Sequence, residues 1–147
     1  MSFDLYMWRQ KAPLTVSPGE FFELLSEDEG SECAEPLNRD EVLAAFRKRF
    51  PDLKDTGIEI DWEGDGSYFQ ACFSYDQQKR LTSVQLSCGF KLCSTPSFDR
   101  IFDVAYDLGC RVYDPQSSNV LVPASRSRGL RALGALLTRR KWFEEKA

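Results

Sequence analysis

The sequence contains no histidine, and this absence removes the residue most often used in acid–base catalysis. Without histidine there is no Ser-His-Asp or Cys-His nucleophilic site, and no side chain whose ordinary pKa lies near 7. Aspartate, glutamate, lysine, tyrosine and cysteine can still transfer protons, but fewer arrangements are available to them. The sequence therefore favours a binding protein over an enzyme, and we assign no catalytic residue from it.

The chain also lacks a C-x-x-C pair. The closest two cysteines are separated by four residues, whereas structural zinc sites normally use closely spaced pairs, often together with histidine. An odd number of scattered cysteines does not form a disulfide framework either. We therefore expect no metal site and five reduced thiols, several of them buried: Cys33, Cys72, Cys88, Cys93 and Cys110.

Signals for targeting, membrane insertion and nucleotide binding are missing as well. The start, MSFDLYMWRQ, has no basic region before an apolar stretch, and no run approaches the roughly 18 apolar residues of a membrane span. The pair Gly64 and Gly66 lacks the third glycine of a dinucleotide-binding loop, and no phosphate-binding loop motif occurs. We expect a cytoplasmic protein with no membrane partner and no cofactor.

The length and composition fit one domain over residues 1–147 with an ordinary hydrophobic core. The chain is 42% hydrophobic and 29% charged, and a domain of this length needs no metal or disulfide to be stable. Its charge is uneven: residues 1–70 carry 16 acidic and 7 basic side chains, and residues 71–147 carry 7 acidic and 12 basic ones. An acidic face would attract a basic partner and repel nucleic acid, if the two halves are also apart in space.

Hydrophobic periodicity predicts an α+β fold, with helices packed on one face of a mainly antiparallel sheet. The predicted order is β-α-α-β-β-β-α-β-(β)-α. Helix starts are indicated by capping boxes at Ser17–Glu20 and Asn38–Glu41 and by Thr95-Pro96, and we expect an exposed acidic loop at Ser26–Pro36. Apolar alternation predicts strands at 2–8, 58–61, 67–75, 81–90, 110–115 and, less regularly, 121–123.

The acidic turn Asp61–Gly66 is the most distinctive short segment. Its first half resembles a calcium-binding EF-hand loop, but position twelve is Cys72, which cannot supply the two oxygens of the usual glutamate. We interpret it as a solvated turn or as a surface for a protein partner, with Trp62 as the apolar anchor. Paired carboxylates for hydrolysis are the enzymatic alternative, and the candidates are Asp61, Glu63, Asp65, Asp103 and Asp107.

The last segment, Ser127–Lys146, is predicted to be an amphipathic helix with a leucine stripe and many arginines. Because the stripe needs burial and the whole chain is acidic, we do not expect nucleic-acid binding. The structural alternative for the chain is a regulatory or structural subunit that forms a homo-oligomer through this helix.

Two segments resemble a group of small bacterial proteins. They are the start Ser2–Trp8, which reads SFDLYMW, and Leu108–Gln116, which reads LGCRVYDPQ. Some proteins of this kind are similar to immunity proteins, which neutralise a toxin by binding it. The resemblance implies no catalytic residue or cofactor, and it implies a protein partner.

These observations together favour a non-catalytic binding protein, most concretely an immunity protein that contacts a basic toxin domain. An inhibitor of this kind needs shape and charge rather than catalytic groups, and an acidic surface suits a basic enzyme. The residues expected to bind the partner are Glu29, Glu32, Asp61, Trp62, Glu63 and Asp65.

Overall fold

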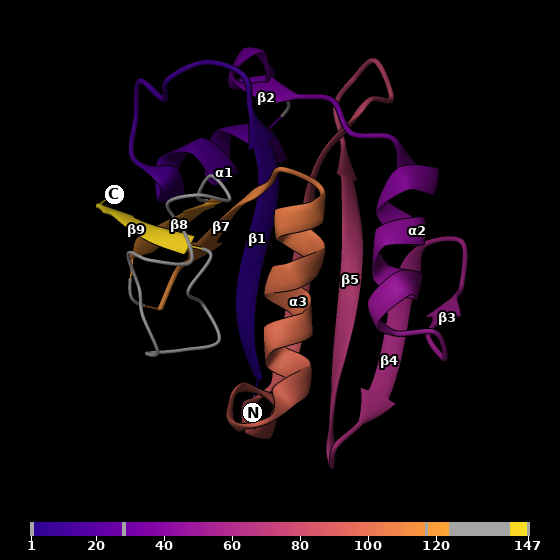
Figure 1. Ribbon diagram of the computed structural model, residues 1–147. Helices are drawn as coiled ribbons and strands as arrows, with labels where there is room; N and C mark the ends of the chain where they lie inside the picture. The colour runs from indigo at the N-terminus through magenta and orange to yellow at the C-terminus, as the bar shows by residue number, and fades with distance from the viewer. Residues whose placement is uncertain (1, 28, 117, 124–141, 147) are drawn as a thin grey trace.

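A computed structural model describes residues 2–27, 29–116, 118–123 and 142–146 (Figure 1). The helices are α1 (Pro18–Ser26), α2 (Arg39–Arg49) and α3 (Pro96–Asp107), and short 3₁₀ turns occur at Ser31–Cys33 and Phe90–Ser94. The strands are β1 (Ser2–Gln10), β2 (Ala34–Glu35), β3 (Lys54–Asp55), β4 (Glu59–Gly64), β5 (Ser67–Tyr75), β6 (Leu81–Gly89), β7 (Arg111–Asp114), β8 (Asn119–Pro123) and β9 (Trp142–Lys146).

The strands form an antiparallel sheet in the order β3-β4-β5-β6-β1-β7-β8-β9, and the short β2 pairs with the end of β1. The predicted α+β class and the β4-β5-β6 meander are confirmed. The N-terminal strand β1 lies in the middle of the sheet, between β6 and β7. Its partners come from the second half of the chain, so the sheet is held together by contacts between distant segments.

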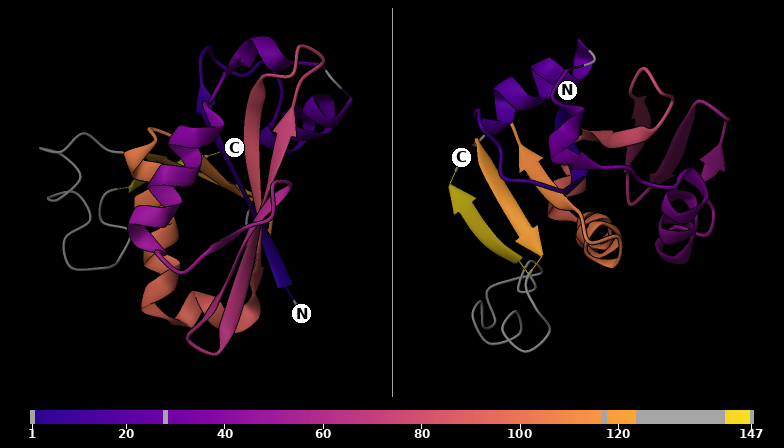
Figure 2. Two further views of the ribbon diagram at one scale, coloured as in Figure 1. Left: turned by 90° about the vertical axis from the view of Figure 1, so that its right-hand side faces the viewer. Right: turned by 90° about the horizontal axis from the view of Figure 1, so that it is seen from above.

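Helices α2 and α3 cover one face of the sheet (Figures 1 and 2). Alternate residues of β1, β4, β5 and β6 point toward them, as period-two patterning requires. The main hydrophobic core between the two layers includes Leu5, Ile60, Phe69, Leu86 and, from the helices, Phe46 and Phe102, all 2% exposed or less.

Helix α1 departs from the predicted arrangement because it packs on the opposite face (Figure 2). The residues of β1 that point away from the main core are Tyr6 and Trp8, and the indole of Trp8 is completely buried. Phe21 and Phe22 of α1 pack on it, with ring centroids 5.9 and 5.1 Å from the indole. A strand in the middle of a sheet that carries large aromatic side chains on its second face needs a cover on that face too.

The predicted helix starts at Ser17 and Asn38 are confirmed. The Ser17 hydroxyl accepts from the Glu20 amide, and the Asn38 side chain accepts from the Glu41 amide at 3.1 Å, so each satisfies one free N–H of the first turn. Thr95 precedes α3 as predicted, but its hydroxyl donates to the Leu92 carbonyl instead of capping the helix. Gly109, with φ +68°, follows the end of α3.

Two local expectations are corrected. The segment Ser26–Pro36 is not simply an exposed loop, because it contains β2 and the buried residues Cys33 and Ala34. Ile58 does not alternate with Ile60 inside a strand: it precedes β4 and is 82% exposed.

The terminal helix predicted at Ser127–Lys146 is wrong for its last residues. Trp142–Lys146 form strand β9, which pairs with β8. The rest of that prediction, including the leucine stripe, lies outside the described residues. A contact between copies of the chain through a continuous helix to Lys146 is therefore no longer supported.

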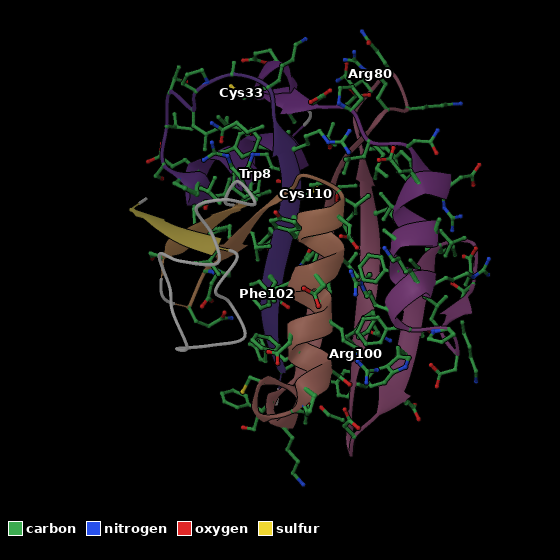
Figure 3. All side chains as sticks on the ribbon, in the orientation of Figure 1. Trp8, Cys33, Arg80, Arg100, Phe102 and Cys110 are labelled. Atoms are coloured by element: carbon green, nitrogen blue, oxygen red, sulfur yellow. The ribbon has the colours of Figure 1, made fainter. Side chains whose placement is uncertain are left out.

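All five cysteines lie in the described ranges and are free thiols. Burial raises the pKa of Cys88 and of Cys110 to about 12, and Figure 3 shows Cys110 beside α3, where it belongs to the main core. Cys72 and Cys93 are exposed. Because the thiolate is the reactive species, thiols that are buried and protonated react slowly.

We therefore predict that iodoacetamide at pH 8 modifies Cys72 and Cys93 of the native protein, and Cys88 and Cys110 only after denaturation. Peptide mass spectrometry with and without urea measures this directly. Rapid modification of Cys110 without denaturant would contradict its place in the core.

Candidate binding surface

The second face of the sheet is the candidate functional surface. Helix α1 covers it over β1, β7 and β8, and no described helix covers it over β4, β5 and β6 (Figure 2). Side chains that alternate with the core residues point out here, and nearly all are polar. This open face consists of Glu59, Asp61 and Glu63 on β4, Tyr68, Gln70, Cys72 and Ser74 on β5, and Ser83, Gln85 and Ser87 on β6.

The acidic residues of the open face form a row along β4. Glu59, Asp61 and Glu63 are two residues apart, so their side chains leave the same side of the strand, successive ones separated by roughly 6–7 Å. Across the row, on β5, lie Cys72, Gln70 and Tyr68. The row therefore faces neutral neighbours on the β5 side, where the Cys72 thiol donates to the Glu59 carboxylate at 3.7 Å.

Asp61 occupies the middle of this row and has an unsatisfied carboxylate oxygen. Its Oδ1 atom is buried and has no hydrogen-bond partner among the described residues. Lys54 on β3 lies directly opposite Asp61 in the register. A buried acceptor without a donor is costly.

A recess of about 220 Å³ lies at the β3–β4 edge of the sheet. It is lined by Asp52, Lys54, Asp61, Trp62 and Glu63. It brings together Asp61 and Glu63, two of the carboxylates that the sequence offered as candidates for hydrolysis.

Trp62 is a core residue and not the exposed anchor that the sequence predicted. Only 7% of it is exposed, and its ring packs against Phe50 and Phe69, with centroids 5.0 and 5.7 Å away. Its indole N–H donates to the Asp52 carboxylate at 2.9 Å. Since Trp62 alternates with Asp61 and Glu63 on a strand, it must point to the opposite face.

The other predicted binding residues lie away from the β4 row. Asp65 is in the β4–β5 turn, where it accepts a short hydrogen bond from the Ser97 hydroxyl at the start of α3. Glu29 and Glu32 are exposed beside α1 and β2, and β2 pairs with β1, which is three strands from β4. The structure therefore splits the predicted surface into two separate acidic patches.

The acidic turn is a tight β-hairpin and not a calcium loop. Asp65 and Gly66 both have positive φ, +54° and +74°, as a two-residue hairpin turn requires. In the described part of the chain, no group of three or more potential ligand side chains is placed to hold a metal ion. Of the carboxylates offered on α3, Asp107 instead pairs with Arg49 at 3.0 Å.

A second hollow lies where α1 meets the open face, and sequence reasoning missed it. This α1 cleft has a volume of about 390 Å³. Tyr6, Phe22 and Tyr113 form an aromatic wall, and Ser74, Ser83 and Gln85 line it from the sheet. The alternation of Tyr6 and Trp8 with the core residues of β1 was the only available signal, because it indicates a second buried face.

None of the described helices is long and apolar enough to cross a membrane. Comparison with protein-family models, with curated proteins and with solved structures found no match to this chain. The open face and the α1 cleft are therefore the two features from which a function is inferred.

Proposed function

We propose that this protein is a non-catalytic binding protein, most concretely an immunity protein that neutralises a basic toxin domain by direct contact. The observation that carries the proposal is the open face of the sheet, with its row of Glu59, Asp61 and Glu63. The resemblance of the two sequence segments to small bacterial proteins points in the same direction.

The open face has the physical properties that an inhibitor needs. Its side chains leave strands that belong to a continuous sheet, in which β4 pairs with β5 along its whole length and β5 pairs with β6, so little ordering is needed when a partner binds. Its acidic row attracts a basic surface and raises the rate of association. Asp61 lies in the middle of the row and also lines the recess at the β3–β4 edge, where a lysine or arginine of the toxin can approach its carboxylate.

A pull-down with the tagged protein from a lysate of the native cells, at moderate salt, tests the proposal. We expect one partner in 1:1 ratio, basic in charge, whose toxic activity falls when the protein is added. Recovery of the protein without a stoichiometric partner, or with one whose activity is unaffected, would contradict it.

A small carboxylate-dependent enzyme is the second candidate, and the recess at the β3–β4 edge favours it. Hydrolysis of glycosides uses two carboxyl groups facing one substrate, and Asp61 and Glu63 line this recess together. Turnover of chromogenic glycosides by the wild type that is abolished by both Asp61→Asn and Glu63→Gln would support this candidate. Turnover that survives either change would remove it.

A further inference from the structure

The α1 cleft is a built hollow at the boundary between the covered and open parts of the sheet. Its aromatic wall is rigid: Tyr6 stacks on Phe22 with a centroid distance of 4.5 Å, and Phe22 stacks on Tyr113 at 5.7 Å. Leu25 of α1 adds an aliphatic surface. A volume of about 390 Å³ lies within the range of ligand-binding pockets.

Ser83 gives the cleft a hydroxyl group. The residue is 3% exposed and lines the cleft from β6. A hydroxyl can both donate and accept a hydrogen bond, so it offers a polar contact to a ligand atom in the hollow. Gln85 lines the cleft beside it and adds an amide, which can both donate and accept.

The charge around the cleft has one sign. Glu23 on α1 is the only acidic or basic side chain among the described residues that line it. Burial, the nearby Asp4 carboxylate and Tyr113 together raise the pKa of Tyr6, so its hydroxyl stays neutral at pH 7. The β4 row adds three carboxylates to the same side of the sheet. An anion is therefore disfavoured here, and a cation is favoured.

From this geometry we infer that the α1 cleft receives a long basic side chain, lysine or arginine, of the protein partner; this inference rests on the proposed function. The aliphatic stem would lie along Phe22 and Leu25, as such stems do on apolar surfaces. The charged end would reach Glu23 and hydrogen-bond to Ser83 and Gln85. The β4 row would attract the partner, and the cleft would fix its position.

Titration of the isotope-labelled full chain with three small amides, followed by NMR, tests the inference without the partner. Two of them are N-acetyl-arginine methylamide and the corresponding citrulline compound, which has a similar shape and no charge. The third, N-acetyl-lysine methylamide, shows which basic side chain fits better. We expect saturable shifts of the Tyr6, Glu23, Ser83 and Gln85 signals with a basic probe, and weaker ones with citrulline.

Two variants and a matched control complete the test. Glu23→Gln should raise the Kd of the preferred basic probe about threefold, which is the size expected for a partly exposed ion pair. Ser83→Ala should also weaken binding, and Glu20→Gln, an exposed residue of the same helix outside the cleft, should not. Absence of saturable shifts with both basic probes, or equal binding of citrulline, would overturn the inference.

The cleft inference and the proposed function can fail independently of each other. If a partner is found whose affinity is unchanged by Glu23→Gln and Ser83→Ala but reduced by changes in the β4 row, the cleft inference fails and the binding function stands. If no partner is found, the proposed function fails, whatever the titration shows.

Discussion

Replacing Trp62 by alanine is expected to lower the free energy of unfolding by about 3–5 kcal/mol, the usual cost of truncating a large buried aromatic residue. The indole is 93% buried against Phe50 and Phe69, and alanine would leave a cavity between α2 and the sheet. The change also removes the donor that pairs with the Asp52 carboxylate. Since domains of this size are stable by only about 5–15 kcal/mol, the variant should be close to unfolding at room temperature.

Urea denaturation followed by circular dichroism measures this effect, and Tyr68→Ala provides the matched control. Tyr68 is on the neighbouring strand, directly across from Glu63, but it points to the open face and is 38% exposed. Its loss should cost about 1 kcal/mol or less. If both variants lost the same stability, the assignment of Trp62 to the core would be wrong. The comparison separates a core aromatic residue from a surface one within a single hairpin.

Neutralising the β4 row is expected to weaken partner binding about 100-fold. The variant carries Glu59→Gln, Asp61→Asn and Glu63→Gln, which keep the size of each side chain and remove three charges. Partly exposed ion pairs contribute up to about 1 kcal/mol each, so three lost pairs correspond to roughly two factors of ten. Asp61 is expected to contribute most, because it lies in the middle of the row and lines the recess at the β3–β4 edge.

The comparison variant carries Glu29→Gln, Glu32→Gln and Glu35→Gln, which remove the same charge from the other acidic patch. All three residues are exposed, and Glu35 lies on β2, which pairs with β1, three strands from the row. Isothermal titration calorimetry at two salt concentrations should show a large loss for the first variant and less than about threefold for the second. The opposite ranking would move the binding surface to the α1–β2 side, where the sequence also placed it.

Local patterns in the sequence predicted most of the elements, because caps and period-two alternation act over a few residues. Period-two alternation also predicts the correct face for Trp62, because a residue between Asp61 and Glu63 on a strand cannot share their face. The prediction failed because the segment was interpreted as a protruding turn, whereas β4 runs to Gly64 and the turn is only Asp65-Gly66.

The sequence could not reveal what depends on long-range pairing. The position of β1 between β6 and β7 places aromatic residues of β1 on a face that needs α1, and that arrangement creates the α1 cleft. The two-residue strands β2 and β3 are too short for any periodic signal. The sequence grouped the candidate carboxylates together, and only the structure shows that Glu29 and Glu32 lie apart from Asp61 and Glu63.

The central position of β1 also has a consequence for synthesis on the ribosome. Among the described strands β1 is translated first, yet Val112, which pairs with Met7, is translated roughly 100 residues later, about 5–20 s at ordinary elongation rates. The apolar residues of β1 have no central neighbour in the sheet until β6 has been made, and the β7 side stays open until the end of that interval. A nascent chain interrupted before β7 would lack the strand that flanks β1 on one side. Fully folded protein should therefore appear only once translation has passed this point.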